Sequence, residues 1–307
     1  MLHILQTALE LGFLYALVPM ALFLSFRVLD IADMTTDGCF VLGTAVSVTM
    51  AAAGHPFQAI PAAMAAGVCA GFVTAFLQTR LGVPSILAGI VTNMGLYTIN
   101  LMVMKWSANV SLLKTATIFT LFQQTGIGGQ WYEALLAGAG VILAGVLLVL
   151  FLGTRLGLSI RATGDNAAMV RASSINPAFT ITVGLCVSGA LCALSGGLLA
   201  QYQKSCDINV GTGMVTIALA SLIIGETLVG KRTMLRRILG VVFGSCLYRF
   251  IVAVALRFNV PAAAMKLVSA IIVAVAISMP AIREHFAFEK RRHAARARRT
   301  VTNREGQ

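Results

Sequence analysis

Residues 132–153 read YEALLAGAGVILAGVLLVLFLG, and Glu133 is the only charged side chain in this run. A helix rises about 1.5 Å per residue, so roughly 20 apolar residues cross a hydrocarbon layer about 30 Å thick. The run is long enough to do so and too apolar for a helix with one face in water. It therefore predicts a helix that spans a membrane.

The composition extends this interpretation to most of the chain. Of its 307 residues, 58% are apolar and 11% are charged, whereas soluble domains carry about 25% charged residues. So few charges cannot cover a water-exposed surface, which excludes an ordinary soluble enzyme. The net charge of +12 does not indicate nucleic-acid binding, because long apolar runs are foreign to that class.

Apolar runs recur along the chain and predict an all-α integral membrane fold with about nine transmembrane helices, within a range of eight to ten. The first run is expected to be a retained span, because no small-residue cleavage pattern follows it. Residues 1–282 then form one transmembrane domain with a cytoplasmic loop at 153–177, and residues 283–307 form a basic tail. The nine runs are 11–28, 38–53, 58–78, 84–104, 132–153, 177–201, 213–229, 238–256 and 262–280.

Basic residues collect on one side of these runs. Arg27, Arg80, the loops after 153 and after 230, and the tail share this side. Cytoplasmic loops carry the excess of Lys and Arg, so the N-terminus is predicted to lie outside the cell. The basic tail fits the anionic inner face of a membrane better than nucleic acid. The outer loop 105–131 forms either a small external cap or a plain connector.

The sequence indicates no bound cofactor or metal. Six cysteines lack CxxC spacing, and five fall in or beside apolar runs, where Cys behaves as a small hydrophobe. Gly225 to Lys231 match the GxxxxGK start of a nucleotide-binding loop, but Arg232 stands where that loop needs Ser or Thr for magnesium. Any ATP hydrolysis is therefore expected on another chain, and this chain is not expected to be an enzyme.

Two matching segments suggest internal symmetry. Asp30-Ile31 precedes a short, glycine-containing run in the first half, and Asp207-Ile208 precedes another in the second half. Such pairs point to a central pathway in transporters built from repeats. Four runs on each side of a fifth require the halves to be inverted, so we predict an inverted 4+1+4 repeat. The pairs Gly67/Gly71 and Gly240/Gly244 predict close helix packing.

Asp30, Asp33 and Asp37 lie together in residues 27–39, RVLDIADMTTDGC. Between two apolar runs they form either a cytoplasmic turn or part of a broken helix that lines a cavity, because unsatisfied backbone is not tolerated against lipid. Asp37, next to Gly38, could cap the helix that follows.

Other polar residues fall inside predicted spans. Arg249 is expected to pair with an acid, either Glu226 or one of the first-half aspartates, as a structural ion pair or as a substrate contact. Thr92, Asn93, Tyr97 and Asn100 give one span a polar and aromatic face. That face either lines a pathway or packs against another helix.

The inner loop 153–177 carries a further signal. Gly164 is expected to break the chain, and Asp165 or Asn166 to cap a helix of two turns at most over 167–172. So short a helix is not stable alone. It needs a docking partner, for which Met169 would be a suitable knob.

Residues 161–172, RATGDNAAMVRA, resemble the coupling-helix loop of inner-membrane permeases of ABC importers, in the superfamily for branched-chain amino acids and ribose. The resemblance is closest to the branch paired with binding proteins for aromatic amino acids such as tryptophan. It covers about residues 10–280. The other matching motifs are SFRVLDIADMTTDG at 25–38, NMGLYTINL at 93–101, LLAQYQ at 198–203 and ALASLIIGE at 218–226.

The resemblance implies a permease fold like that of vitamin B12 and ribose importers, with a broken second helix. Its implied partners are a second permease copy, a cytoplasmic ABC ATPase that binds ATP and magnesium, and a periplasmic or lipoprotein binding protein at a bacterial inner membrane. The expected ATPase-coupling residues are Arg161, Gly164, Asp165, Asn166, Met169 and Arg171. The expected pathway residues are Asp30, Asp33, Thr36, Asp37, Asn93, Tyr97 and Glu226.

The solute is expected to be an amino acid, aromatic or branched-chain, moved by alternating access. An ion-coupled secondary transporter or channel is the alternative. In it, the first-half aspartates and Arg249 would form a proton or ion relay.

Overall fold

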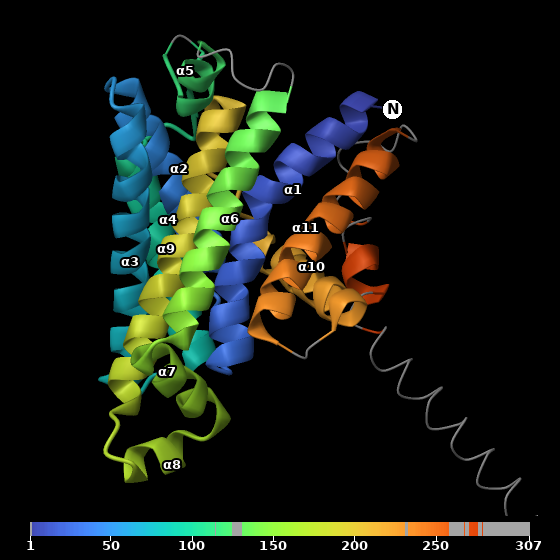
Figure 1. The fold of residues 1–307 in the computed structure, drawn as a ribbon. Helices are drawn as coiled ribbons and strands as arrows, with labels where there is room; N and C mark the ends of the chain where they lie inside the picture. Colours follow the sequence, from blue (N-terminus) through green and yellow to red (C-terminus); the bar gives the residue numbers. More distant parts are fainter. Residues whose placement is uncertain are drawn as a thin grey trace, which may run out of the picture.

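The structure, a computed structural model, describes residues 2–113, 115–124, 131–230, 233–257, 267, 270–275 and 278. In this part the chain is a bundle of long helices (Figure 1). The predicted run 262–280 lies mostly outside the described residues, and the tail 283–307 lies wholly outside them. Six helical stretches are long and apolar enough to cross a membrane: Leu5–Val28, Pro56–Thr79, Ser85–Val103, Tyr132–Gly153, Pro177–Gln203 and Met234–Arg257.

The helices follow the predicted runs within a few residues, except at the start. The first helix begins at Leu2 and continues into a π-helical turn. It therefore contains Glu10, which lies outside the predicted run 11–28. The longer helices are α1 (Leu2–Leu22) with η1 (Phe23–Val28), α2 (Thr36–Ala52), α3 (Pro56–Thr79), α4 (Ser85–Val103), α6 (Tyr132–Gly153), α9 (Pro177–Gln203), α10 (Met214–Val229) and α11 (Met234–Arg257).

Helices α1 and α9, together with the shorter and mostly buried α2, form the centre of the bundle. In α1 and α9, 78% and 67% of the most apolar 18 residues are buried, against about a third or less in the other four long helices. The outer helices expose large apolar side chains such as Phe72, Leu87 and Leu143. Such an apolar surface is stable against lipid and not against water.

Glycines let the helix backbones touch. A side chain at Gly67 would overlap the carbonyl oxygen of Gly189, and one at Gly71 would overlap that of Leu185, so α3 and α9 pack backbone to backbone. Gly244 meets the Ser221 carbonyl on α10 in the same way. Both predicted glycine pairs therefore mark close helix crossings.

The chain between η1 and α2 is not helical. Residues 29–35 lie inside the bundle, where Leu29, Ile31, Asp33 and Thr35 are buried. A side chain at Gly89 of α4 would come within 2.8 Å of the Met34 nitrogen, so α4 packs directly on this segment. Of the two alternatives drawn from the sequence, the structure supports an irregular segment within the bundle and not a surface turn.

A small folded cap closes the end of the bundle near the N-terminus (Figure 1). Strands β1 (Asn109–Ser111) and β2 (Ser205–Asp207) pair antiparallel, with Val110 opposite Cys206. Helix α5 (Ile118–Gln124) follows β1 and is held by the buried side chain of Gln201, whose Oε1 accepts from the Ile118 nitrogen at 2.9 Å. The described residues of this loop, 105–113 and 115–124, therefore form more than a plain connector.

The opposite end carries α7 (Arg155–Asp165) and α8 (Ala167–Ala172) (Figure 1). The sequence predicted α8 but not α7. Gly164 does not break the chain as expected. It lies within α7, and a side chain there would overlap the carbonyl oxygen of Val28, so glycine is what lets α7 pack on η1.

Candidate functional site

A cavity of about 280 Å³ opens between α2, α4 and the segment that links β2 to α10. We call it the α2–α4 cavity. Its volume is just below the range of about 300–1,000 Å³ for ligand sites, which suits one small solute. It is lined by Asp37, Gly38, Val41, Asn93, Met94, Tyr97, Asn100, Ile208, Asn209, Gly211 and Thr212.

Asp37 ties this cavity to the start of α10. Its carboxylate accepts from the backbone nitrogens of Gly213 at 3.1 Å and Val215 at 2.9 Å. These N–H groups belong to the first turn of α10, which has no intrahelical acceptor for them and carries partial positive charge. The sequence prediction that Asp37 caps its own helix was wrong, because Asp37 sits inside the first turn of α2 and caps a distant helix.

The two glycine-containing segments that the sequence paired therefore meet. A side chain at Gly211 would overlap the carbonyl oxygen of Asp37, and Gly213 adopts the left-handed φ of +84°. Only glycine fits both demands at this crossing. The N-terminal ends of the two short helices α2 and α10 are thus joined inside the bundle.

Helix α4 supplies the polar wall of the cavity. Asn93 lies close enough to Gly38 that a side chain there would overlap the Asn93 amide oxygen. Asn100 is buried and donates from Nδ2 to the Gly38 carbonyl at 3.2 Å, while its Oδ1 has no hydrogen-bond partner in the described part of the chain. Tyr97 is 51% exposed. This helix face lines a cavity, so it is not only a packed face.

The other predicted pathway residues lie elsewhere. Asp33 is buried and accepts from the backbone and hydroxyl of Thr35, which fixes the turn that leads into α2. Thr36 donates to the Asp33 carbonyl at 3.3 Å, and Asp30 is exposed with a φ of +55°. None of these three lines the α2–α4 cavity. The hydrogen bonds of Asp33 and Thr36 stabilise the turn that leads into α2.

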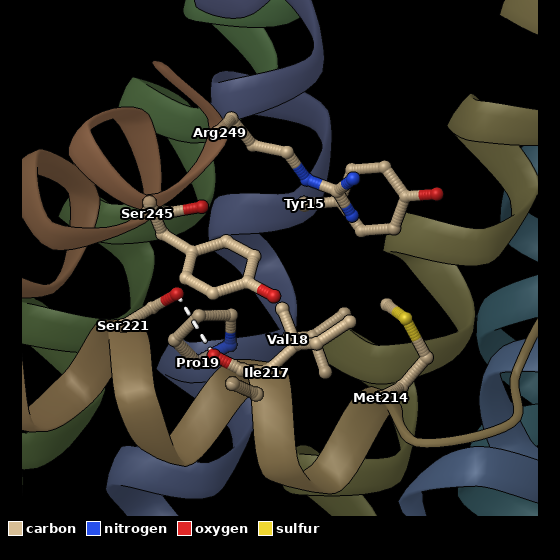
Figure 2. Close-up of a pocket in the computed structure, with 10 residues that line it drawn as sticks. Tyr15, Val18, Pro19, Met214, Ile217, Ser221, Ser245 and Arg249 are labelled. Carbon is tan, nitrogen blue, oxygen red and sulfur yellow. Dashed lines mark hydrogen bonds between the residues drawn. The ribbon is translucent and has the colours of Figure 1, made fainter. Parts of the chain in front are cut away.

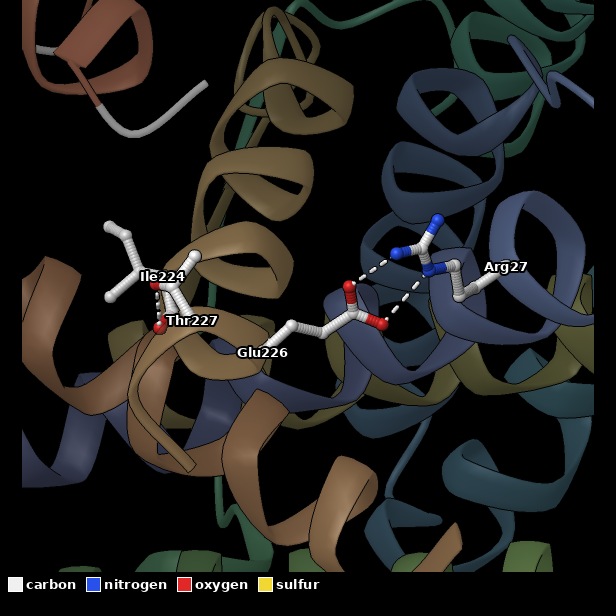
Figure 3. A network of polar contacts seen from close by, with 4 residues as sticks. All are labelled: Arg27, Ile224, Glu226 and Thr227. Carbon is white, nitrogen blue, oxygen red and sulfur yellow. Dashed lines mark hydrogen bonds and ion pairs between the residues drawn. The ribbon is translucent and has the colours of Figure 1, made fainter. Parts of the chain in front are cut away.

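Glu226 pairs with Arg27. The carboxylate accepts from Arg27 Nε at 3.0 Å and from Nη2 at 2.8 Å, as Figure 3 shows. Such two-point pairing of a guanidinium with a carboxylate is strong and directional. It joins the π-helical end of α1 to the last turns of α10, far from the α2–α4 cavity lining.

The expected partner of Arg249 was wrong. No acid in the described residues pairs with Arg249, whose guanidinium carbon lies 3.4 Å from the centre of the Tyr15 ring. Glu226 is engaged by Arg27, Asp33 by Thr35, and Asp37 by the backbone at the start of α10. A tyrosine face is an alternative partner for a guanidinium, and sequence spacing gives no signal for it.

The predicted coupling residues lie on α7 and α8. Asn166 caps α8, because its Oδ1 accepts from the nitrogens of Ala168 at 3.1 Å and Met169 at 3.0 Å. Asp165 and Arg171 are exposed, Met169 is 69% exposed and Arg161 is half-buried. Together with Gly164, which contacts η1, they form a protruding elbow with an apolar tip.

The sequence reading missed Glu10. It is 3% exposed and accepts from Gln6 at 2.9 Å and from the Tyr202 hydroxyl at 2.9 Å. Glu10 follows Gln6 by four residues, and on a helix this spacing favours a side-chain hydrogen bond. Its partner on α9 was not readable from sequence.

The chain matches known permeases over most of its length. The family described as branched-chain amino acid transport system, permease component, matches residues 4–277. A tyrosine transport system permease protein of Clostridioides difficile is 32% identical over 84% of this chain and 85% of its own length. The autoinducer 2 import system permease LsrC of Salmonella paratyphi B is 27% identical over 71% of this chain and 61% of its own length.

No solved structure is significantly similar to this one. The assignment therefore rests on the sequence match together with the membrane-spanning helices of the bundle. The chain is a multi-pass membrane protein, and it belongs to the permease components of branched-chain amino acid transport systems, within the ABC importer permeases.

Proposed function

We propose that this chain moves an amino acid across a bacterial inner membrane, with aromatic amino acids such as tyrosine as the favoured class. The observation that carries the proposal is the α2–α4 cavity, which is lined by both polar and apolar side chains, has the size of one small solute and is built where two short helices meet. The tyrosine permease among the relatives supports this solute class. The ring of Tyr97 offers an aromatic face for stacking.

The proposed transporter contains two copies of this chain, an ABC ATPase on the cytoplasmic side and an external binding protein. The elbow of α7 and α8 supports an ATPase contact, because Met169 projects from a short, capped helix at the end of the bundle that carries most basic loops. The chain itself breaks no bond in this scheme, and ATP with magnesium binds the partner. The N-terminus and the β1–β2 cap then face the binding protein.

We further propose the inverted 4+1+4 arrangement around α6. Its support is a matched set of packings: α3 lies on α9 and α11 lies on α1, while α2 packs on α3 and α10 on α11. Inversion exchanges α1 with α9, α2 with α10 and α3 with α11. The fourth member of the second half falls on 262–280.

The coupling route in this scheme runs through contacts that the structure shows. The elbow touches the Val28 carbonyl through Gly164, and Arg27 in the same turn holds Glu226 on α10. The other end of α10 is capped by Asp37 in the cavity. Movement of the elbow is thereby linked to the cavity through one short helix.

The test is uptake into proteoliposomes that hold this chain with the ATPase and binding protein encoded beside its gene. We expect ATP-dependent uptake of L-tyrosine that requires the binding protein. Asn100→Ala should lower uptake at least fivefold, and Met102→Ala, an exposed position on the same helix outside the cavity, should not. Uptake without ATP that collapses with the proton gradient would instead establish the ion-coupled alternative.

A further inference from the structure

A second polar site lies where α1, α10 and α11 meet. Figure 2 shows Tyr15 of α1, Ser221 of α10 and Ser245 and Arg249 of α11 around it. Tyr248 and Met214 also line it. We call it the α1–α10–α11 junction. It shares no lining residue with the α2–α4 cavity.

Two buried polar atoms in the junction have no hydrogen-bond partner in the described part of the chain. They are the hydroxyl of Tyr248, a residue 1% exposed, and Nε of Arg249. The nearby hydroxyls are already committed to backbone carbonyls: Ser221 donates to Ile217 and Ser245 to Gly12, each at 2.9 Å. In the described part of the chain, neither serine oxygen accepts a hydrogen bond from Tyr248 or from Arg249 Nε.

Neither water nor the tyrosine ring relieves these groups. The space between the side chains has no room for a water molecule, which needs about 10–15 Å³. The Tyr15 ring contacts the flat face of the guanidinium, and hydrogen bonds leave a guanidinium from its edge. Polar groups left without partners inside a membrane protein are costly and mark function by default.

The missing partner must accept hydrogen bonds and carry negative charge. Arg249 is permanently charged, and a guanidinium edge matches the two oxygens of a carboxylate. A tyrosine hydroxyl can donate to the same group. Met214, the first residue of α10, also lines the junction, next to the N–H groups that the Asp37 carboxylate already accepts from.

We propose that the α1–α10–α11 junction binds the carboxylate of the transported solute when α10 and α11 separate from α1 during transport. That this carboxylate belongs to the transported solute rests on the proposed function, whereas the geometry of the site does not depend on it. The junction and the α2–α4 cavity meet at one helix end, since Asp37 of the cavity holds the nitrogen of Val215, the residue after Met214. A solute leaving the cavity along α10 would therefore meet Arg249 and Tyr248.

The site is tested without knowing the solute. Ser221→Cys is placed in the complete transporter, and its labelling by anionic sulfonatoethyl and cationic trimethylammonioethyl methanethiosulfonate is measured by mass spectrometry. Rates are normalised to those of Gln203→Cys, which is exposed. During ATP turnover we expect the anion to be favoured about tenfold. Arg249→Gln should abolish the preference, and Arg236→Gln, the same change at an exposed position of α11, should keep it.

Equal normalised rates for the two reagents would overturn the site. So would a preference that survives Arg249→Gln, or a residue 221 that stays unlabelled throughout turnover. Each of these results would stand whether or not the transporter carries an amino acid.

Transport tests the source of the carboxylate. L-tyrosine uptake should fall at least tenfold in Arg249→Gln and less in Arg249→Lys, which keeps the charge, with thermal stability measured for both. L-tyrosinamide, which lacks the carboxylate, should not compete with L-tyrosine in the wild type. Wild-type uptake by Arg249→Gln would overturn the proposal. An anion preference at residue 221 without L-tyrosine uptake by the wild type would keep the site and reject the solute class.

Discussion

The crossing of α3 with α9 and the junction of α1 with α10 and α11 are built on the same small residues but differ in their polar groups. At the first, Gly67 and Gly189 bring two backbones together and no charge lies between them. At the second, Gly12 and Ser245 bring α1 and α11 together, and Arg249 and Tyr248 remain with unsatisfied atoms beside them. The first crossing is complete as it stands, whereas the second lacks a hydrogen-bond partner in the described part of the chain. We infer that the first is the fixed part of the bundle and the second the part that moves.

The largest effect is expected from a break in the fixed crossing. Gly67→Ala puts a methyl group into the Gly189 carbonyl, and overpacking typically costs about 1–3 kcal/mol. We expect a clear drop in the melting temperature of the purified transporter and in membrane yield. Gly95→Ala is the matched control, because a side chain there meets nothing within 4 Å. Equal stability of the two variants would show that α3 and α9 are not locked together.

The second prediction concerns the link between the moving part and the elbow. Glu226→Gln or Arg27→Ala should lower uptake several-fold and keep basal ATPase activity. The destabilisation should be smaller than the roughly 3–5 kcal/mol seen when fully buried pairs are broken, because Arg27 is 38% exposed. The exchange Arg27→Glu with Glu226→Arg should restore part of the uptake. If neither single change alters uptake, α10 does not take part in coupling.

A third comparison uses two helix caps. Asn166→Ala removes the cap of α8 and Asn176→Ala that of α9, where the side chain accepts from Ala178. Each loss costs about 1 kcal/mol. Only the first should raise ATP consumption per solute transported, because α8 is the proposed ATPase contact. An equal effect of both variants would point to general loosening of the fold.

The smallest effect is expected at the cap. Burial raises the pKa of the Cys206 thiol in β2 to about 11, so less than about 1% is thiolate at pH 8 and the thiolate is the reactive form. Maleimide labelling of Cys206 should be far slower than that of Gln203→Cys, and should rise with pH up to about 11. Fast labelling at pH 8 would mean that the β1–β2 cap opens readily.

The sequence predicted what depends on local composition. Apolar length placed the spans, and the capping Asn166 with its short helix was readable from residues 164–172 alone. The polar face of α4 was also visible, since Asn93, Tyr97 and Asn100 recur at helical spacing.

Contacts between distant segments were not predictable. That Asp37 caps α10, that Glu226 holds Arg27 and that Arg249 rests on Tyr15 depend on how helices more than a hundred residues apart cross. Helix α7 was missed because Gly164 was expected to break the chain, and α7 also contains Gly157. In the fold they are sites where other backbone comes close.

The π-helical turn Phe23–Val28 gives α1 one residue more than a regular helix of the same rise would hold. Each residue of an α-helix turns the chain by about 100°. Deleting a single residue from this turn would leave the span apolar and long enough to cross the membrane. It would nevertheless turn this stretch into regular helix, so that the positions of the turn, Arg27 among them, would no longer present the same side chains to Glu226. The number of residues between the two membrane faces in this helix therefore matters to the transporter as much as any side chain does.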